Sequence, residues 1–433
     1  MTAISARIAE LPRHVGATVV VRGWATHLRS SGKVAFAVVR DGSGVVQAVF
    51  VKAALAPEVW TRFAELTLEC SVAVTGEVRA DARAPGGVEL SVTDVTIVGA
   101  SPIDYPIQPK EHGIDFLLDH RHLWLRSPRQ RAIFVVRNEV EQAIHDFYYA
   151  RAFLRVDTPI LTAAIGERSG LFETEYFDEG KAYLAQTGQL YGEAAAAAFG
   201  LIYTFGPTFR AEKSKTRRHL TEFWMIEPEM AWYDLEDSMR LQEDFVAFLV
   251  ARVVERCRPQ LEELGRDVSL LERYTTPFHR LDYGDAVALV QRKGSETQWG
   301  HDLGAEDEAL IVEDYDKPVF VTRYPKEAKA FYMKENPEDA RTVLCADLLA
   351  PEGYGEIIGG SQREDDYDKL LVRIHEEGLD PAAYDWYLDL RKYGTFVHSG
   401  FGLGLERTVA WICGLPHIRE VIAFPRMMHR LNP

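Results

Sequence analysis

The chain has 433 residues, of which 47% are hydrophobic and 26% charged, and this predicts an ordinary globular protein of two or three domains. Its formal net charge of −16 excludes a nonspecific nucleic-acid coat, which would be basic overall, but leaves room for a specific nucleic-acid partner held by local basic patches. Four widely spaced cysteines, with no signal segment and no long apolar run, predict a cytoplasmic protein without disulfides, a zinc site or a membrane span.

Residues 1–100 are rich in β-branched side chains and are predicted to form a small β-barrel. A helical pattern at residues 56–66 lies between the third and the fourth of five predicted strands. This order is typical of an OB-fold, a frequent binder of single-stranded nucleic acid, and another small β-barrel is the alternative. The predicted strands span residues 18–24, 34–39, 45–51, 71–78 and 88–98.

A proline-containing linker or hinge at residues 101–126 is predicted to lead into a second domain at residues 127–433. Strands and helices do not alternate regularly there, which favours an antiparallel α+β domain over a doubly wound sheet. Neither a phosphate-binding G-x-x-x-x-G-K loop nor a G-x-G-x-x-G motif occurs. Residues 258–321 are interpreted as a structural insertion. The predicted elements are helices at 131–149, 193–199 and 234–257 and a strand at 153–161.

A predicted hairpin at residues 209–229 is the most informative stretch. Its period-2 pattern places Arg210 and Glu212 on one face of the first strand, and Phe223, Met225, Glu227 and Glu229 on one face of the second. Arginine can pair with phosphate, an aromatic ring can stack on a base, and carboxylates can take up amino groups or a metal ion. The hairpin therefore suits a polyphosphate nucleotide. The charges alone favour a solvated surface hairpin, but burying an unpaired carboxylate among apolar residues costs free energy.

Three further segments carry polar side chains that would complete such a site. Residues 186–193 form a polar loop that enters a helix, and alone they indicate only a turn with a helix cap. Asp347 and Glu356 offer oxygen ligands for Mg²⁺, among glycines that allow close approach of a ligand. Residues 399–408 alternate glycine with apolar residues and then place Arg407 at the start of a helix, although tight sheet packing alone would explain such glycines.

Together these segments resemble the class II aminoacyl-tRNA synthetases, in the subclass of the aspartyl, asparaginyl and lysyl enzymes, over nearly the whole chain. Residues 153–159 resemble the first family motif, whose proline lies at a dimer interface, and residues 209–229 and 400–407 resemble the second and the third. The resemblance implies a homodimer with an OB-fold anticodon-binding domain and a catalytic domain built on an antiparallel sheet flanked by helices. It also implies ATP-dependent formation of an aminoacyl-adenylate, followed by transfer to tRNA.

The resemblance also implies roles in binding ATP. Arg210 would hold the α-phosphate, Phe223 would stack on adenine, and Arg407 would cover the other face of adenine and reach the γ-phosphate. Catalysis by Arg210, Glu356 and Arg407 would rest on positioning and charge neutralisation, without a protein nucleophile. The other implied ATP contacts are Glu212, Arg218 and His219, and the implied Mg²⁺ ligands are Asp347 and Glu356.

Asparagine is favoured over aspartate by residues of the amino-acid site. The loop Gln-Thr-Gly-Gln, which ends at Gln189, is close to the asparaginyl type, whereas aspartyl enzymes carry proline at the position of Gly188. Glu193 stands where aspartyl enzymes keep a lysine. By resemblance, Glu227 would accept the side-chain amide N–H of asparagine, and Arg363 would donate to its oxygen. A carboxylate at position 227 would repel aspartate. The implied substrates are therefore L-asparagine and tRNA(Asn).

Two further assignments follow from the same resemblance. Glu167 is the candidate for holding the α-ammonium group, in a loop about one residue shorter than usual where Arg168 replaces the expected glycine. Arg29, Phe36 and Gln47 fall at the spacing this subclass uses for anticodon reading. Phe36 would stack on the central uridine, and the other two side chains would hydrogen-bond its edge.

Three alternatives remain beside this interpretation. A non-discriminating aspartyl enzyme is disfavoured by Gly188, Glu193 and Glu227. A tRNA-independent asparagine synthetase derived from the same catalytic fold would lack the anticodon domain, whereas residues 1–100 are present. A regulatory protein with an inactive synthetase domain would have lost residues such as Arg210 or Arg407, which this chain keeps.

Overall fold

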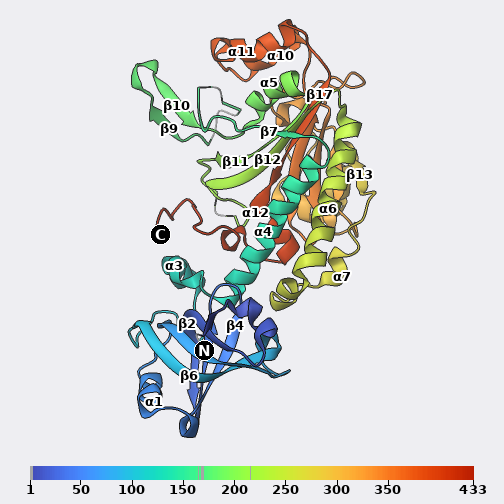
Figure 1. Cartoon of the computed structure of the whole chain (residues 1–433). Coiled ribbons are helices and arrows are strands. Elements are labelled where there is room, and N and C mark those ends of the chain that lie inside the picture. The colour runs from blue at the N-terminus through green and yellow to red at the C-terminus, as the bar shows by residue number, and fades with distance from the viewer. Residues whose placement is uncertain (1–2, 164, 167–169, 215) are drawn as a thin grey trace. The chain divides into compact units, whose positions relative to one another are not determined.

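The computed structural model describes residues 3–163, 165–166, 170–214 and 216–433, and it divides into two compact units, Met1–His120 and Arg121–Pro433 (Figure 1). We call them unit 1 and unit 2. None of the helices formed by the described residues is long and apolar enough to cross a membrane.

Unit 1 is a closed β-barrel. Its sheet has the order β1-β2-β3-β4-β6-β5, and an additional pairing of β2 with β5 closes it. Buried and half-buried residues alternate along the strands, so that one face of each strand supplies the barrel core. The five strands and one helix predicted from the sequence are confirmed as β2–β6 and α1. The elements are β1 (Ile4–Ser5), β2 (Thr18–Ser30), β3 (Val34–Arg40), β4 (Val45–Val51), α1 (Pro57–Ala64), β5 (Ser71–Ala80), β6 (Val88–Gly99) and α2 (Ile114–Asp119).

Unit 2 is built on an eight-stranded sheet with the order β13-β14-β15-β16-β17-β12-β11-β7. Its central pairings, from β14 to β11, are antiparallel, and the outer pairs β13–β14 and β11–β7 are parallel. The predicted antiparallel α+β domain is therefore confirmed. The strands are β7 (Leu154–Arg155), β11 (Leu201–Phe209), β12 (Glu222–Ala231), β13 (His279–Asp282), β14 (Val319–Thr322), β15 (Cys345–Ala350), β16 (Gly355–Gln362) and β17 (His398–Gly404).

Helices cover this sheet, and two long ones, α4 and α6, run side by side along it (Figure 1). The main core lies where α4, α6 and α12 meet the sheet, and it includes the buried Phe147, Phe245 and Trp411. A small separate sheet joins β8 (Leu161–Thr162), β10 (Lys181–Leu184) and β9 (Glu173–Glu175). The helices are α3 (Arg121–Trp124), α4 (Pro128–Tyr149), α5 (Gln189–Phe199), α6 (Leu235–Glu263), α7 (Val268–Leu271), α8 (Tyr283–Arg292), α9 (Ala305–Val312), α10 (Tyr367–Glu376), α11 (Asp385–Lys392) and α12 (Leu405–Cys413).

Helix boundaries differ from the predicted ones for local reasons. Helix α4 begins three residues earlier than predicted, because Ser127 caps it by accepting from the Gln130 N–H and Pro128 occupies the first turn. Helix α5 begins at Gln189 rather than at residue 193. Helix α6 extends to Glu263, but its backbone departs from helical geometry at Cys257, where the helix was predicted to end. A proline follows two residues later, at position 259.

The predicted strand at residues 153–161 is wrong. Only Leu154–Arg155 and Leu161–Thr162 are strands, and they belong to different sheets. Pro159 lies between them and has no N–H to donate to a neighbouring strand, so continuous pairing through this segment is not available.

Candidate active site

A cavity with about 640 Å³ of space between its lining atoms, open solvent included, lies in unit 2. We call it the main cavity. Its lining comes from the connection between β11 and β12, from β12, β16 and β17, and from the first turn of α12. The lining residues are Arg210, Glu212, Arg218, His219, Leu220, Phe223, Met225, Glu356, Ile357, Gly402, Gly404, Glu406, Arg407 and Ile418.

The glycines of β17 make room for side chains of the neighbouring strand β12. The two strands pair antiparallel, with Met225 opposite Gly404 and Glu229 opposite Gly400. A Cβ atom at Gly402 would collide with the methyl group of Met225, and one at Gly400 would collide with the Glu229 carboxylate. The alternating glycines therefore allow close side-chain packing, and they also leave part of the main cavity floor without side chains.

The expectation that Arg210 and Glu212 share a strand face is wrong. Strand β11 ends at Phe209, and beyond it the hydrogen bond from Arg210 N to Thr221 O continues the pairing. The backbone N–H of Ala211 instead donates to the Gly170 carbonyl at 2.7 Å. The chain leaves the hairpin here because its backbone finds another partner. Both predicted side chains nevertheless line the main cavity.

Arg210 and Phe223 meet at one end of the main cavity. The guanidinium carbon of Arg210 lies 5.5 Å from the centre of the Phe223 ring, and both side chains line the cavity. Nearby, His219 Nε2 lies 3.5 Å from a carboxylate oxygen of Glu212. Burial lowers the pKa of His219, and the positive charge of Arg407 lowers it further. The structure thus brings together an aromatic ring, cationic groups and a carboxylate, as the sequence predicts.

Arg218 is held by a carboxylate that the sequence did not suggest. Its Nη1 donates to Glu308 Oε2 at 2.6 Å, and its Nη2 donates to the carbonyl of Gly353. Both side chains of this ion pair are largely buried, with 12% and 13% of their surface exposed. Burial and the charge of Glu356 raise the pKa of Glu308 to about 7. Glu308 belongs to α9, within the segment interpreted as a structural insertion.

Arg407 connects the main cavity to the strand that carries Glu356. Its Nη1 donates to the backbone carbonyl of Glu356 at 2.9 Å and lies 3.7 Å from the carboxylate of the same residue. Because α12 begins at Leu405, Arg407 stands in the first turn of this helix and faces the main cavity.

Asp347 of β15 and Glu356 of β16 converge over Gly359. A Cβ atom at this glycine would lie 2.7 Å from Glu356 Oε1 and 3.5 Å from Asp347 Oδ1. Lys329 Nζ lies 2.6 Å from the other oxygen of Asp347. Burial raises the pKa of Asp347 to about 6, with Lys329 opposing the shift and Glu356 adding to it. The two carboxylates repel each other, and the glycine keeps the space between them clear. A cation would therefore bind favourably to this pair.

This carboxylate pair cannot form a complete metal site by itself. Among the described residues, no group of three His, Cys, Asp or Glu side chains could hold a metal ion. Mg²⁺ is often held by one or two carboxylates together with phosphate oxygens and water. The donor set of Asp347 and Glu356 therefore fits Mg²⁺ that arrives with a nucleotide.

Glu227 is buried and accepts hydrogen bonds from three donors. Gly188 N donates at 2.9 Å and Thr204 Oγ1 at 3.2 Å, and Thr187 Oγ1 donates to the other oxygen. An ionised carboxylate offers about four acceptor positions, so one remains for a further N–H or O–H donor. Glu227 is thus a fixed acceptor rather than an unpaired charge.

Glu229 and Arg363 form a fully buried ion pair beside Glu227. Arg363 Nε donates to Glu229 Oε2 at 3.3 Å, its Nη2 donates to the other oxygen, and its Nη1 donates to Ser361 Oγ at 2.8 Å. Burial raises the pKa of Glu229 to about 7, and Arg363 opposes this shift. Arg363 has five N–H donors, so it retains capacity for another acceptor.

Glu193 is the centre of a second buried network. It accepts from Arg391 Nη2 at 2.7 Å, from Tyr387 Oη at 2.7 Å and from Gln189 Nε2 at 3.0 Å, and His398 Nε2 lies 2.9 Å away. The partners more than offset the effect of burial, so the pKa of Glu193 lies well below its usual value. Gln189, predicted for the amino-acid site, is thereby fixed at the start of α5. The predicted Glu167 lies outside the described residues.

In unit 1 the three predicted anticodon residues lie together on β2, β3 and β4. Arg29 is paired with Phe36 in the strand register, and its guanidinium carbon lies 4.2 Å from the centre of the Phe36 ring. Its Nη2 also donates to Gln47 Oε1 at 3.0 Å. Gln47 Nε2 in turn donates to Glu89 at 3.4 Å. One face of the barrel therefore carries an aromatic ring flanked by hydrogen-bonding groups.

Several residues of the site gave no signal in the sequence. Glu308 stands in an acidic run at the start of α9, which is the usual composition of a solvated helix start. Lys329 and Arg391 lie outside any recognised motif. Their partners Asp347 and Glu193 are 18 and 198 residues away. The sequence would have revealed these residues only if each had stood at a fixed spacing from its partner, as in a recognised motif.

Comparison with known proteins gives two matching family models. Residues 113–428 match the family described as tRNA synthetases class II (D, K and N), and residues 19–98 match the OB-fold nucleic acid binding domain. Among curated relatives, the asparagine–tRNA ligase of Desulforamulus reducens is 56% identical over 98% of this chain and 99% of that protein. The asparagine–tRNA ligase of Chloroflexus aurantiacus is 55% identical over 99% of both.

Solved structures similar to this chain include asparaginyl-tRNA synthetases. The asparaginyl-tRNA synthetase from Pyrococcus horikoshii complexed with asparaginyl-adenylate has a TM-score of 0.96 and 46% identity, with all of both chains covered. The Entamoeba histolytica asparaginyl-tRNA synthetase in complex with asparaginyl-adenylate has a TM-score of 0.91 and 33% identity, again over all of both chains.

Proposed function

Because this chain belongs to the class II tRNA synthetases of the D, K and N group, we propose that it activates L-asparagine with ATP and transfers it to the 3′ end of tRNA(Asn). The observation that carries this proposal is the similarity, over nearly the whole chain, to relatives that are asparagine–tRNA ligases. The OB-fold barrel of unit 1 supplies the nucleic-acid module that a tRNA-independent enzyme would not need.

The choice of asparagine rests on Glu227. Its one remaining acceptor position can take an N–H of the substrate amide, whereas the carboxylate of aspartate would be repelled. Gly188 supports this role, because its N–H donates to Glu227 and a proline at that position could not do so. Arg363, fixed by Glu229, donates to the amide oxygen. A site that must hydrogen-bond the correct group can discriminate by about 10⁴-fold without editing.

ATP occupies the main cavity in this proposal. Phe223 stacks on one face of adenine and Arg407 covers the other, while Arg210 binds the α-phosphate. The asparagine carboxylate attacks the α-phosphorus, and Arg210 stabilises the charge that develops there. Glu356 and Arg407 complete the catalytic set. Glu212, Arg218 and His219 make the remaining ATP contacts.

Asp347 and Glu356 would hold Mg²⁺ together with phosphate oxygens of ATP. The support is the convergence of the two carboxylates over Gly359 and the raised pKa of Asp347. When bound, the ion neutralises phosphate charge in the transition state. Lys329 fixes the orientation of Asp347 through the bond to its second oxygen.

A homodimer fits the exposed apolar residues near the edge of the large sheet. β7 is an edge strand, and Leu154 and the nearby Ile160 and Leu161 are 44–49% exposed. Tyr149, at the end of α4, is also exposed. Unpaired strand edges with apolar side chains are common sites of association. We therefore propose that this edge pairs with a second copy of the chain.

In unit 1, Phe36 stacks on the central anticodon base, and Arg29 and Gln47 bind its edge. The contact between Arg29 and the Phe36 ring leaves a charged group beside the stacking surface. All four cysteines are buried and free, which fits a reducing compartment, and we propose a cytoplasmic location.

The test of the function is ATP–pyrophosphate exchange with each amino acid in turn. Asparagine is expected to support exchange, and aspartate is expected to support it hardly at all. Comparable rates with the two amino acids would overturn the substrate assignment. Charging of tRNA(Asn) but not tRNA(Asp) by the same preparation tests the second step.

A further inference from the structure

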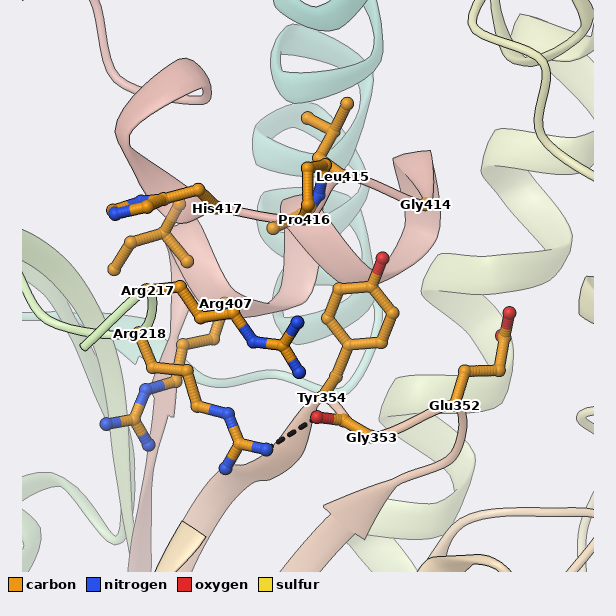
Figure 2. A pocket seen from close by; sticks show the side chains of 12 residues that line it. Arg217, Arg218, Glu352, Gly353, Tyr354, Arg407, Gly414, Leu415, Pro416 and His417 are labelled. Carbon is orange, nitrogen blue, oxygen red and sulfur yellow. Dashed lines mark hydrogen bonds between the residues drawn. The ribbon is translucent and has the colours of Figure 1, made fainter. Parts of the chain in front are cut away.

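A second hollow of about 660 Å³ adjoins the main cavity, and the two share Arg218, Arg407 and Ile418. We call it the side cavity. Figure 2 shows three arginine side chains, from positions 217, 218 and 407, gathered on one side of it, with Tyr354 facing them. The chain that follows α12, at residues 414–418, forms another part of the wall. Arg218 and Arg407 therefore line both spaces.

The side cavity holds more positive charge than its own carboxylate offsets. In the described part of the chain, Arg217 makes no ion pair, and its exposed guanidinium points toward Tyr354 (Figure 2). The carboxylate in the lining, Glu352, is already paired with Arg266 at 2.6 Å and accepts from Tyr274. Glu352 is thus not available to neutralise Arg217. An anion with several charges would do so.

His417 fits the same environment. Burial lowers its pKa to about 4, and the charges of Arg419 and Arg217 lower it further. Its Nδ1 accepts from the Arg419 N–H at 3.1 Å, so Nε2 carries the proton of the neutral ring and can donate. The side cavity is thus lined by a neutral histidine and by arginine side chains, and arginine binds phosphate oxygens well.

The proposed reaction releases its leaving group toward the side cavity. The asparagine carboxylate oxygen forms a bond to the α-phosphorus while the bond from that phosphorus to the bridging oxygen breaks. The bridging oxygen keeps the electron pair and leaves within pyrophosphate, so no proton or electron acceptor is required. In-line displacement sends pyrophosphate away from the amino acid, which Glu227 and Arg363 hold, and toward Arg218 and Arg407.

We propose that the side cavity is a subsite for inorganic pyrophosphate, which passes Arg218 and Arg407 and is received by Arg217 while the adenylate stays in the main cavity. This inference rests on the proposed function, because it takes pyrophosphate as the product. Before adenylate forms, the β- and γ-phosphates remain tied to the nucleotide, so Arg217 contributes less to ATP binding than to pyrophosphate binding. The reverse reaction should enter through the same subsite.

The test is pyrophosphorolysis of preformed enzyme-bound asparaginyl-adenylate, followed in single turnovers against pyrophosphate concentration. Arg217→Lys, Arg217→Ala and Arg217→Glu are compared with the unmodified chain. The pyrophosphate concentration for half-maximal rate is expected to rise in that order. A roughly tenfold rise for Arg217→Ala would match the loss of one charge-assisted hydrogen bond. The increase in KM for ATP is expected to be several times smaller.

Lys213→Ala is the matched control, because Lys213 lies in the same connection but does not line the side cavity. This variant should behave as the unmodified chain. Calorimetric titration with inorganic pyrophosphate, using enzyme loaded with a non-hydrolysable asparaginyl-adenylate analogue, should show the same order of affinities for the Arg217 variants.

Two outcomes would overturn the subsite. One is a half-saturating pyrophosphate concentration that stays within twofold in every Arg217 variant. The other is an equal effect on ATP and on pyrophosphate, which would assign Arg217 to nucleotide binding. Failure of the proposed function would look different, since the unmodified chain would then form no adenylate from asparagine at all.

Discussion

Glu308 of α9 accepts a 2.6 Å hydrogen bond from Arg218, 90 residues earlier in the chain, and both side chains are largely buried. Glu308→Ala should free Arg218 from its fixed orientation and leave its charge without a close partner. We expect KM for ATP to rise about fivefold to tenfold, in line with a coupling of about 1 kcal/mol. In a double-mutant cycle with Arg218→Ala, the two effects should not add. Additive effects would show that Glu308 does not act through Arg218.

Glu227→Gln replaces one oxygen of a carboxylate that already accepts three hydrogen bonds with an NH₂ group. The new group can only donate, and it would face the donors Gly188 N or Thr187 Oγ1. We expect KM for asparagine to rise at least about tenfold, with KM for ATP nearly unchanged, because a charged acceptor contributes about 1.5–3 kcal/mol. Exchange kinetics with varied asparagine measure this. Glu222→Gln, on the same strand, is the control. An unchanged KM for asparagine would refute the role of Glu227.

Arg391→Leu should destabilise unit 2. Glu193 would keep His398 and Tyr387 but lose its buried cation, and removing one partner of a buried ion pair costs about 3–5 kcal/mol. Urea unfolding followed by far-UV circular dichroism should show an earlier transition. The double variant Glu193→Gln with Arg391→Leu should recover part of the loss. If the double variant is less stable than the single one, the pair is not the cause.

The half-buried His417 predicts a pH dependence of stability. Its pKa is about 4 in the folded chain and has an ordinary value of 6.5, so the unfolded chain binds the proton more readily. Stability from this residue is therefore complete above pH 6.5 and is lost as the pH falls toward 4. His417→Gln should flatten that part of the stability curve. In addition, Arg217→Ala should raise the pKa of His417 in an NMR titration, and an unchanged pKa would contradict their proximity.

Phe36→Ala should weaken charging of tRNA(Asn) without changing ATP–pyrophosphate exchange. The loss of one base-stacking surface corresponds to about 1–3 kcal/mol, or roughly fivefold to 150-fold in kcat/KM for tRNA. Phe36→Tyr keeps the ring and should restore most of the activity. If Phe36→Ala lowers exchange as well, the variant has damaged more than the anticodon face.

The sequence predicts the barrel well because its strands alternate buried and half-buried residues, a local pattern that needs no knowledge of partners. It also identifies Arg210, Phe223 and Arg407, which meet around one cavity although they come from separate segments. It fails where a partner is distant. Glu308 looks like part of a solvated helix start, and only the folded unit 2 brings α9 next to Arg218 and Gly353.

Two errors have a similar origin. The predicted strand at residues 153–161 followed local β-propensity, but Pro159 removes a donor, and the two ends join different sheets. The predicted strand face of Arg210 and Glu212 assumed that the hairpin continues, whereas Ala211 finds its backbone partner at Gly170. In both places the outcome depends on which other segment offers a hydrogen bond, and the local pattern carries no information about that segment.

Strand β12 carries Phe223 and Glu227 on one face, four residues apart. A strand rises about 3.3 Å per residue, so the two positions are separated by about 13 Å of nearly inextensible backbone. The strand thus fixes the distance between the ring that stacks on the base and the carboxylate that accepts from the amino-acid side chain. A single residue inserted between them would turn the side chains that follow it in β12 to the opposite face. The spacing along the strand therefore sets the length of the substrate that fits.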